Sequence, residues 1–297
     1  MDAHRLGLIC ATLIFPAAAT SSFAALPAPT SCTGCWQPPV GARLQYQLQG
    51  VTAYASTGGI NVDITAVPAE GGSAVAPEVF DIDLYVDSAV NGRIDEMNTA
   101  ATSAIHAKGA RAICYLDAGT WENWRPDANQ YPSVVLGRKN GWAGERWVDI
   151  RRIDLLGPIL AARAQKCVQA GFDAIEWDNV DGYQNRSGFP LTANDQLQFN
   201  AYLANLAHGV GLAVGLKNDV GQLSTLKPYF DFAMNEQCFQ YNECNYPAPG
   251  LPDWTASGKA VFNVEYRSLQ CAKADAWQFG SILKNTNLYD VPWTPCR

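Results

Sequence analysis

The chain has 297 residues, of which 48% are hydrophobic and 16% are charged, and its formal net charge is −7 at pH 7. This acidic balance disfavours nucleic acids and anionic lipid surfaces as partners, because phosphate binding requires clustered basic side chains. The length is sufficient for one large domain with a complete hydrophobic core.

The first 24 residues are expected to form a secretory signal peptide. Arg5 supplies the positive charge, residues 6–19 the apolar segment, and Ser22-Phe23-Ala24 a cleavage site with small residues at its ends. Pro16 interrupts the apolar segment, and no later stretch approaches the roughly 20 apolar residues that span a bilayer. We therefore predict a secreted, extracellular protein that does not cross a membrane.

The cysteines agree with export. Nine are present, and the eight that follow the expected signal peptide are an even number, which favours disulfides over metal ligation. Cys32 and Cys35 have the spacing of a zinc-binding or redox-active pair, but no second such pair and only three His residues accompany them. We therefore predict no metal site and no cofactor.

Spacing suggests only part of the disulfide pairing. Cys238 and Cys244 flank a loop and can form a local bridge, whereas Cys271 and Cys296 can fix the C-terminus. Cys114 lies inside a predicted strand, where it can remain a free thiol. The full connectivity stays open at this point.

Residues 25–40 form a lead rich in Pro, Ala, Thr and Ser, after which strand and helix patterns alternate. Strands are predicted at residues 44–48, 79–86, 110–115, 147–150, 172–177, 212–216, 230–234 and 260–265. Helices are predicted at residues 92–107, 153–170, 193–208, 222–227 and 269–283. Residues 50–77 read as an insertion after the first strand, for which we favour a surface loop over a small β-flap.

This alternation predicts a (β/α)8 TIM barrel that occupies residues 41–297 as a single domain. A doubly wound open sheet is the alternative, but no Gly-rich phosphate loop follows any predicted strand. In a barrel, the carboxyl ends of all strands meet at one mouth, which carries the functional side chains. The residues at the predicted strand ends are therefore the candidates for chemistry.

Acidic residues dominate these strand ends. Glu176 lies near the end of the fifth predicted strand, Asp178 and Asp181 follow that strand, and Glu236 follows the seventh. Strands two apart in a small barrel point into the same mouth, so two of these carboxyl groups can face one glycosidic bond. One of them must then hold a proton while the other stays ionised. Asp178 and Glu236 are the candidate catalytic pair.

Lys217 and Asn218 follow the sixth predicted strand and would lie between the two acids. There they could donate hydrogen bonds and hold one carboxylate ionised. Lys217 could instead neutralise Asp219 in a structural pair.

The chain resembles glycoside hydrolase family 114, the secreted endo-α-1,4-polygalactosaminidases with a TIM-barrel fold. The similarity runs from about Trp36 to Cys296. Its most specific motifs are Trp177-Asp178-Asn179-Val180-Asp181-Gly182-Tyr183, Leu216-Lys217-Asn218-Asp219 and Met234-Asn235-Glu236-Gln237-Cys238. Further matching segments are residues 36–39, 45–48, 115–120, 124–127, 141–151 and 265–266.

The resemblance implies hydrolysis inside α-1,4-linked galactosamine polymers such as galactosaminogalactan, with an Asp and a Glu as catalytic residues. The matching positions are Asp178, which we expect to be the nucleophile, and Glu236, which we expect to be the acid/base. Reversed roles and an inverting mechanism remain open.

De-N-acetylated galactosamine carries an ammonium group, so an acidic cleft attracts it. The candidate substrate-binding residues combine acids that can pair with amines, rings that can stack on sugars, and polar groups between the catalytic acids. They are Asp83, Tyr115, Asp117, Trp124, Glu176, Asp181, Tyr183, Lys217, Asn218, Glu265 and Tyr266. The expected partner is a cationic amino-sugar polysaccharide, bound by a monomer.

Two other functions remain open. The substrate could be another amino-sugar polymer, such as partly acetylated galactosaminoglycan or chitosan. Alternatively, the barrel could bind glycans without catalysis. Loss of one catalytic acid would mark such a binding protein, and both Asp178 and Glu236 are present.

Overall fold

The computed structural model describes residues 25–297, so the expected signal peptide over residues 1–24 lies outside the described residues. Two sheets organise this part of the chain. A nine-stranded sheet lies at the centre, and a three-stranded antiparallel sheet is separate from it.

The nine-stranded sheet is a nearly closed barrel with eight parallel strands. In hydrogen-bonding order they are β1 (Leu44–Gln47), β2 (Val79–Asp83), β3 (Arg111–Asp117), β7 (Ala174–Asp178), β8 (Ala213–Lys217), β9 (Phe232–Glu236), β10 (Val261–Glu265) and β11 (Gly280–Leu283). The ninth strand, β12 (Thr294–Pro295), pairs antiparallel with β11. The predicted (β/α)8 TIM-barrel fold is confirmed.

Loop amides and an indole close the seam between β1 and β11. The N–H groups of Leu48 and Gln49 donate to the Leu288 carbonyl at 3.0 and 3.1 Å. The Nε1–H of Trp293 donates to the Leu44 carbonyl at 2.7 Å. These hydrogen bonds satisfy backbone N–H and C=O groups that in a regular β-ladder would pair with the neighbouring strand. The carboxyl ends of the strands therefore form a nearly complete ring.

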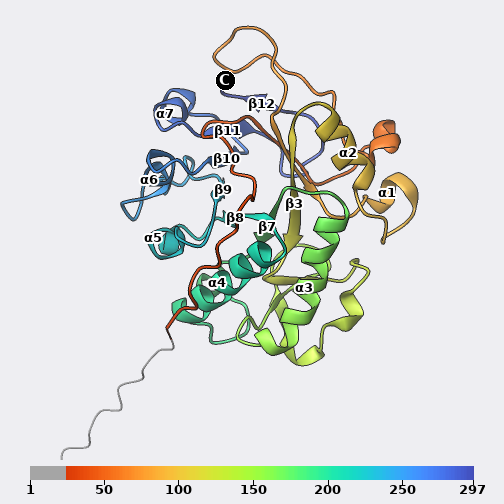
Figure 1. Cartoon of the computed structure of the whole chain (residues 1–297), viewed down its shortest axis with the longest axis vertical. Coiled ribbons are helices and arrows are strands. Elements are labelled where there is room, and N and C mark those ends of the chain that lie inside the picture. Colours follow the sequence, from red (N-terminus) through yellow and green to blue (C-terminus); the bar gives the residue numbers. More distant parts are fainter. Residues whose placement is uncertain (1–24) are drawn as a thin grey trace, which may run out of the picture.

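Helices surround the barrel (Figure 1). They are α1 (Ser88–Asn91), α2 (Thr99–Ala107), α3 (Ile153–Gln169), α4 (Ala193–Gly209), α5 (Leu223–Leu226), α6 (Leu251–Ala256) and α7 (Cys271–Ala276). Apolar residues recur with a helical period in α3, and they are buried at Leu156, Leu160, Ala164 and Cys167, whereas Val168 is 39% exposed. The helical period of this segment therefore identified its core-facing side.

The predicted fourth barrel strand, residues 147–150, is wrong. Part of it lies in β6 (Glu145–Val148), which pairs antiparallel with β4 (Thr120–Glu122) and β5 (Leu136–Lys139) in the separate sheet. The fourth barrel strand is β7, which pairs directly with β3. A short apolar run does not reveal its partner strand, so periodicity could not distinguish the two sheets.

The eighth barrel strand, β11, lies where a helix over residues 269–283 was predicted. Helix α7 accounts only for the first part of that segment. Gln278 then adopts a left-handed φ of 57°, and the chain enters β11. A four-residue strand that closely follows a short helix is too short for its period to be distinguished from that of the helix.

The predicted helix over residues 92–107 is too long at its amino end. Gly92 has a φ of 73° and terminates α1, whereas α2 begins only after Asn98. A glycine in this conformation ends a helix more readily than it starts one.

Residues 50–77 form mainly an irregular surface segment, which agrees with the favoured interpretation. The described elements there are one 3-10 helix, η1 (Thr52–Thr57), and an isolated bridge between Ala66 and Val75. The Ala69 N–H donates to the Pro295 carbonyl at 2.8 Å. The insertion thus reaches from the end of β1 to β12, in the place of a first barrel helix.

Four disulfides join the eight cysteines of the described residues. They are Cys32–Cys35, Cys114–Cys167, Cys238–Cys244 and Cys271–Cys296. The two suggested bridges are confirmed, whereas the free thiol at Cys114 is wrong. This residue connects β3 to the buried face of α3, a partner 53 residues away that spacing could not indicate.

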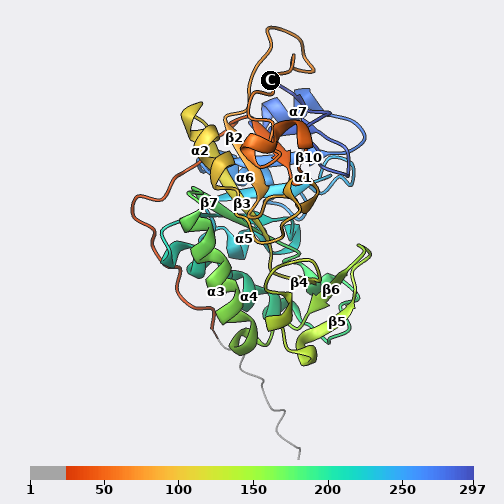
Figure 2. The same ribbon diagram turned by 90° about the vertical axis from the view of Figure 1, so that its right-hand side faces the viewer.

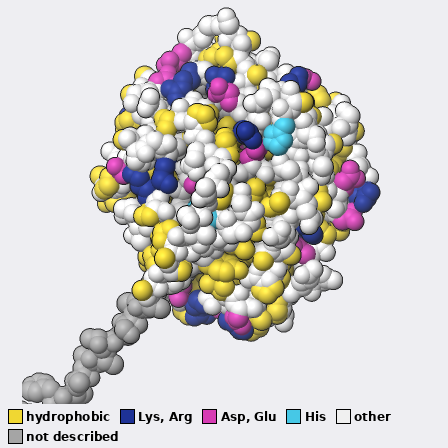
Figure 3. Space-filling model, in the orientation of Figure 1, with side chains coloured by type: hydrophobic (Ala, Val, Ile, Leu, Met, Phe, Trp, Pro, Cys, Tyr) yellow, Lys and Arg dark blue, Asp and Glu magenta, His cyan; other side chains and the backbone are white. Residues whose placement is uncertain are grey.

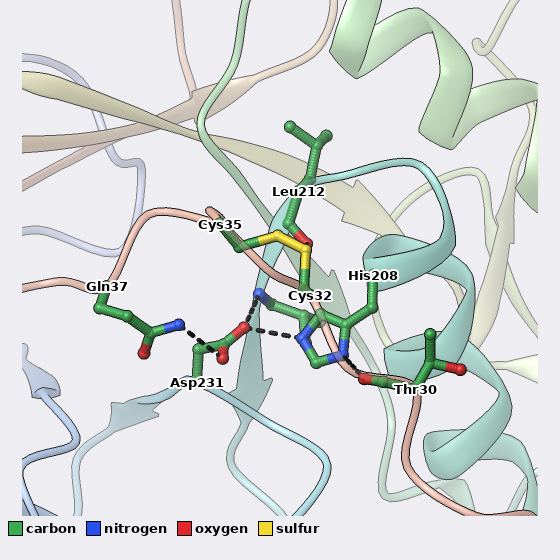
Figure 4. Close-up of a disulfide and its surroundings, with 8 residues drawn as sticks. Thr30, Cys32, Cys35, Gln37, His208, Leu212 and Asp231 are labelled. Carbon is green, nitrogen blue, oxygen red and sulfur yellow. Dashed lines mark hydrogen bonds and ion pairs between the residues drawn. A yellow bond between two sulfur atoms is a disulfide. The ribbon is translucent and has the colours of Figure 1, made fainter.

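The lead, residues 25–40, crosses the amino ends of β8 and β9 (Figure 4). His208 is 2.8 Å from Asp231 Oδ2 through Nε2 and 2.8 Å from the Thr30 carbonyl through Nδ1. Both partners accept, so both ring nitrogens carry hydrogen. Burial lowers the pKa of His208, but Asp231 outweighs it and the pKa is raised. Figure 2 shows the lead and the sheet of β4, β5 and β6 on opposite sides of the molecule.

The surface agrees with the acidic, mixed composition. On the face in Figure 3, acidic and basic side chains lie beside one another in small groups rather than in one basic patch. Among residues 25–297, no helix combines the length and apolar character that crossing a bilayer requires.

Candidate active site

Three neighbouring barrel strands end in charged residues at the mouth. Strand β7 ends at Asp178, β8 at Lys217 and β9 at Glu236, and the strands pair in this order. Parallel strands end at the same edge, so these side chains meet. Successive side chains of a strand alternate in direction, so Asp178 shares the inward face of β7 with Glu176.

The residue that follows each of these strands has a left-handed backbone. The φ angle is 58° at Asn179, 48° at Asn218 and 61° at Gln237. This region is uncommon for residues with a Cβ atom and concentrates at functional sites. Asn218 also fixes the neighbouring strand, because its Oδ1 accepts a 2.9 Å hydrogen bond from the Glu236 N–H.

Lys217 lies at the centre of the charged cluster. Its Nζ is 3.1 Å from Asp178 Oδ1, 3.4 Å from Glu236 Oε2 and 2.9 Å from Glu176 Oε1. It also donates to the Tyr46 hydroxyl at 3.1 Å. Burial alone would lower the pKa of Lys217, but the three carboxylates raise it well above its usual range. The ammonium group therefore stays charged.

Both oxygens of Asp178 accept hydrogen bonds. Tyr115 donates its hydroxyl to Oδ2 at 2.8 Å, whereas Lys217 and the Asn179 N–H donate to Oδ1 at 3.1 and 2.7 Å. Burial raises the pKa of Asp178, but Lys217 and these hydrogen bonds outweigh it, so the pKa is lowered. Asp178 is therefore ionised at neutral pH.

Glu236 is the more exposed carboxyl of the two. Its side chain is 24% exposed, compared with 19% for Asp178. The Tyr266 hydroxyl donates to its Oε1. Two tyrosines from different strand ends thus each orient one carboxyl group.

A layer of buried acids lies beneath this pair. Asp81 on β2 and Glu176 on β7 are both 0% exposed. Within residues 25–297, both oxygens of Asp81 and Oε2 of Glu176 lack a hydrogen-bond partner. Two ionised carboxylates have no hydrogen with which to form a hydrogen bond to each other. A proton on one of the two carboxyl groups allows that group to donate a hydrogen bond to the other. Burial, followed by the charge of Glu176, raises the pKa of Asp81 well above its usual range, so Asp81 is the protonated member.

Replacing Asp81 by Asn should be tolerated, and the variant should gain stability relative to wild type as pH rises. The folded wild type holds the Asp81 proton more tightly than the unfolded chain, so it loses stability as pH rises above about 3.9. Asn holds no such proton. Urea unfolding across about pH 4 to 7 tests this linkage. Parallel pH dependences of the two unfolding free energies would contradict it.

A groove crosses the mouth over the carboxylate pair. Two adjoining cavities, of about 280 and 620 Å³, both contain Asp178 and Glu236. Tyr115, Trp142 and Glu145 also line both cavities. The pair therefore lies inside a long groove rather than at the end of a closed pocket.

Two carboxyl groups in a groove at a barrel mouth are the usual equipment of glycoside hydrolases. The sequence model of glycoside-hydrolase family GH114 matches residues 25–296. The chain belongs to family GH114. It is therefore a glycoside hydrolase.

Solved structures agree with this GH114 assignment. Ega3 from Aspergillus fumigatus, solved in complex with galactosamine, is 29% identical, with a TM-score of 0.71 over 89% of this chain and 98% of Ega3. The glycoside hydrolase domain of PelA from Pseudomonas aeruginosa is 12% identical, with a TM-score of 0.57 over 86% of this chain and 98% of that domain, and shares the fold. No curated protein matches the chain by sequence.

Most of the site residues predicted for this GH114 chain line the groove. They are Asp83, Tyr115, Trp124, Asp178, Asp181, Lys217, Asn218, Glu236 and Tyr266. Asp83 lies there as an ion pair, because Arg125 donates to its two oxygens at 2.6 and 2.7 Å. The alternative partner of Lys217, Asp219, instead accepts from Asn200 at 2.9 Å.

The other predicted residues do not line these two cavities. They are Asp117, Glu176, Tyr183 and Glu265. Glu265 is 0% exposed and accepts from the Phe239 N–H at 3.0 Å. Asp117 accepts from the Thr120 N–H at 2.7 Å and from Asn179 Nδ2 at 2.6 Å. These two acids hold the loops of the mouth rather than face the groove.

Trp142 and Glu145 line both cavities but were not among the candidates. Trp142 lies between β5 and β6 and is 63% exposed, and Glu145 begins β6. Burial raises the pKa of Glu145 to about 7, despite a hydrogen bond from Asn140. Both residues come from the unforeseen three-stranded sheet. Their only sequence signal was that residues 141–151 belong to the family resemblance.

Gly119 permits a close approach between two loops of the mouth. A Cβ atom at this position would lie 1.7 Å from the Asn179 carbonyl oxygen, a distance at which no side chain fits. The Gly119 N–H donates to the Asp178 carbonyl at 3.1 Å. Glycine is therefore required beside the end of β7.

Proposed function

We propose that this GH114 chain is a secreted, endo-acting hydrolase of α-1,4-linked galactosamine polymers that retains the anomeric configuration. Asp178 is the nucleophile and Glu236 the acid/base. One observation carries the proposal: both carboxylates contact Lys217 Nζ, at 3.1 and 3.4 Å. The lowered pKa of Asp178 supports the order of the roles.

The shared contact with Lys217 limits the separation of the two carboxylates. Asp178 Oδ1 and Glu236 Oε2 cannot be further apart than the two contact distances together, about 6.5 Å. Retaining glycosidases hold their carboxyl groups roughly 5 Å apart, and inverting ones use roughly 6.5–9.5 Å. The limit favours retention.

Retention proceeds in two balanced steps. Asp178 first attacks the anomeric carbon while Glu236 gives its proton to the leaving glycosidic oxygen, so one C–O bond forms as the other breaks. Glu236 then takes a proton from water, whose oxygen displaces Asp178 and releases the sugar. Lys217 and Tyr115 stabilise the Asp178 carboxylate before attack and again as it leaves.

The substrate class follows from charge and from the likeness to Ega3. That protein, 29% identical, was solved with galactosamine. In the groove of this chain, Asp181 and Glu145 present carboxyl groups that form no ion pair within residues 25–297. The ammonium groups of de-N-acetylated galactosamine gain Coulomb energy beside such groups. A groove on both sides of Asp178 and Glu236 suits cleavage within a chain.

Secretion is part of the same proposal. The disulfides of the described residues are typical of oxidising compartments outside the cytosol. Together with the signal-like residues 1–24, they support an extracellular enzyme. In this proposal residues 41–297 form the single catalytic domain, residues 25–40 are its N-terminal lead, and the enzyme acts as a monomer without a cofactor.

The proposal is tested on purified α-1,4-galactosamine polymer, with chitosan as a comparison because its glucosamine units are joined by β-linkages. Oligosaccharides of intermediate length should be released from the first polymer and not from the second. Release from chitosan alone, or of monosaccharide alone, would contradict the proposal.

A further inference from the structure

Resting on the proposed function, we propose that the two ends of the groove select different sugars. One end, the acidic arm, requires a free-amine galactosamine, and the other end, the aromatic arm, accepts N-acetylated residues. The acidic arm is lined by Asp181, Asp219, Tyr241 and Glu243. The aromatic arm is lined by Leu48, Trp124, Ile94, Tyr85 and Arg125. The preferred polymer is then one that is partly N-acetylated.

The acidic arm is continuous with the catalytic part of the groove. Its cavity of about 230 Å³ shares Asp181, Asn218 and Glu236 with the cavity that holds the carboxylate pair. None of its lining residues is a Lys or Arg. A sugar bound there lies next to Glu236.

The carboxyl groups of the acidic arm have oxygens left over for a ligand. Asp219 is 2% exposed, and its Oδ1 has no hydrogen-bond partner within residues 25–297. Asp181 Oδ1 accepts from Asn185 at 3.2 Å, and Glu243 enters none of the ion pairs of the described residues. An unpaired buried carboxyl oxygen is costly unless a ligand supplies a donor. An ammonium group supplies three.

The titration of these groups supports a missing cation. Burial, followed by the charge of Asp181, raises the pKa of Asp219 to about 8. Burial, followed by the charge of Asp178, raises the pKa of Asp181 to about 6. Both shifts disfavour the ionised form of these acids, and an ammonium ligand beside them would oppose the shifts.

The carboxyl groups of the aromatic arm are already satisfied. Both oxygens of Asp83 accept hydrogen bonds from Arg125, at 2.6 and 2.7 Å. Asp87 gives one oxygen to the Gly50 N–H and the other to the Ala89 N–H, at 3.1 and 2.8 Å. Each oxygen of Asp83 and Asp87 therefore already accepts a hydrogen bond, so neither residue requires an amine ligand.

Apolar surface replaces free charge in the aromatic arm. Its cavity of about 370 Å³ shares Leu48, Trp124 and Arg125 with the larger catalytic cavity. Trp124 is 43% exposed and Ile94 is 51% exposed. An N-acetyl group is neutral and ends in a methyl group, which gains from contact with such surface. Free-amine sugars are not excluded there, but they gain no ion pair.

The test is the acetylation of the sugars on either side of each cut. A partly N-acetylated α-1,4-galactosamine polymer is digested, and the products are sequenced by tandem mass spectrometry. One class of new ends, reducing or non-reducing, should carry only free-amine residues. The other class should carry acetylated residues in proportion to the polymer. Equal acetylation at both classes of ends would overturn the inference while leaving the proposed function intact.

Variants sharpen this test. Glu243→Gln removes one charge of the acidic arm and should raise KM for a fully deacetylated oligosaccharide about 2- to 5-fold. The Glu243→Gln variant should also allow acetylated residues at the class of new ends that carries only free-amine residues in the wild type. Glu78→Gln removes the same charge from an exposed residue just before β2, at the opposite end of the barrel from the mouth. It should change neither KM nor the acetylation of the new ends. Equal effects of both variants would contradict the assignment of the acidic arm. Failure to cut even the fully deacetylated polymer would contradict the proposed function itself.

Discussion

Asp178→Asn should give a folded protein that binds oligosaccharide but scarcely turns over, with kcat reduced on the order of 10³-fold or more. The Asn side chain has nearly the same shape, so it can keep the hydrogen bond from the Tyr115 hydroxyl. It cannot attack an anomeric carbon as a carboxylate does. The measurements are kcat from reducing-end release and Kd by calorimetry.

A matched control separates this loss from a general effect of removing an acid. Asp154→Asn changes an exposed carboxylate near the start of α3, paired with Arg152. Its kcat and Kd should equal those of wild type. Wild-type turnover in both Asp178→Asn and Glu236→Gln would remove this pair from the mechanism.

Added azide distinguishes the two roles. In Asp178→Asn, azide can replace the nucleophile on the face opposite the α-linked leaving group, which gives a β-glycosyl azide. In Glu236→Gln, azide attacks the intermediate on Asp178 and gives an α-glycosyl azide. A substrate with a good leaving group is needed in both cases. Glu236→Gln cannot protonate the leaving oxygen, and in Asp178→Asn azide must displace the leaving group without the enzyme's nucleophile. Products of the reverse configurations would exchange the roles of Asp178 and Glu236.

Lys217→Met should destabilise the protein and shift its pH dependence. Lys217 is 1% exposed and contacts Glu176, Asp178 and Glu236. Removing one partner of a buried ion pair leaves uncompensated charge, at a cost of about 3–5 kcal/mol. Urea unfolding measures this loss. Lys108→Met, which changes a 52% exposed lysine, should alter the unfolding free energy by less than about 0.5 kcal/mol.

The pH dependence of Lys217→Met follows from the lowered pKa of Asp178. A lowered pKa gives stability that is present above the unfolded pKa and is lost as pH falls through the folded pKa. Without Lys217 the folded pKa of Asp178 rises. The stability deficit of the variant should therefore be larger near neutral pH than in acid. The acidic limb of kcat/KM should also move to higher pH.

A second substitution checks that charge causes this loss. Lys217→Met together with Glu176→Gln removes a buried anion along with the cation, so it should be less destabilised than the two single changes added together. Strictly additive losses would show that Glu176 does not depend on Lys217.

The sequence placed the charged centre of the mouth correctly because that centre depends on local order. Asp178, Lys217 and Glu236 each stand at the last position of a short buried strand. A parallel barrel brings such positions together whatever the loops do. The predicted numbering of the barrel strands was wrong, because β6 was counted in the barrel and β11 was predicted as helix. Neither error changed the predicted order in which β7, β8 and β9 follow one another.

The parts that escaped prediction depend on contacts between distant segments. Arg125 binds Asp83, 42 residues away, and thereby removes a candidate amine partner. Trp142 and Glu145 reach the groove only because β4, β5 and β6 form a sheet of their own. Cys114 finds Cys167 on a helix face. Periodicity reports which face a residue occupies, not what it meets there.

Trapping the covalent intermediate tests the central claim most directly. An activated fluorinated galactosaminyl substrate that forms the glycosyl-enzyme quickly and hydrolyses slowly is incubated with the enzyme, and the peptides are then sequenced by mass spectrometry. The sugar should be found on the carboxyl group of Asp178 and be absent from Asp178→Asn. Attachment to Glu236, or product of inverted configuration with no adduct at all, would contradict the account.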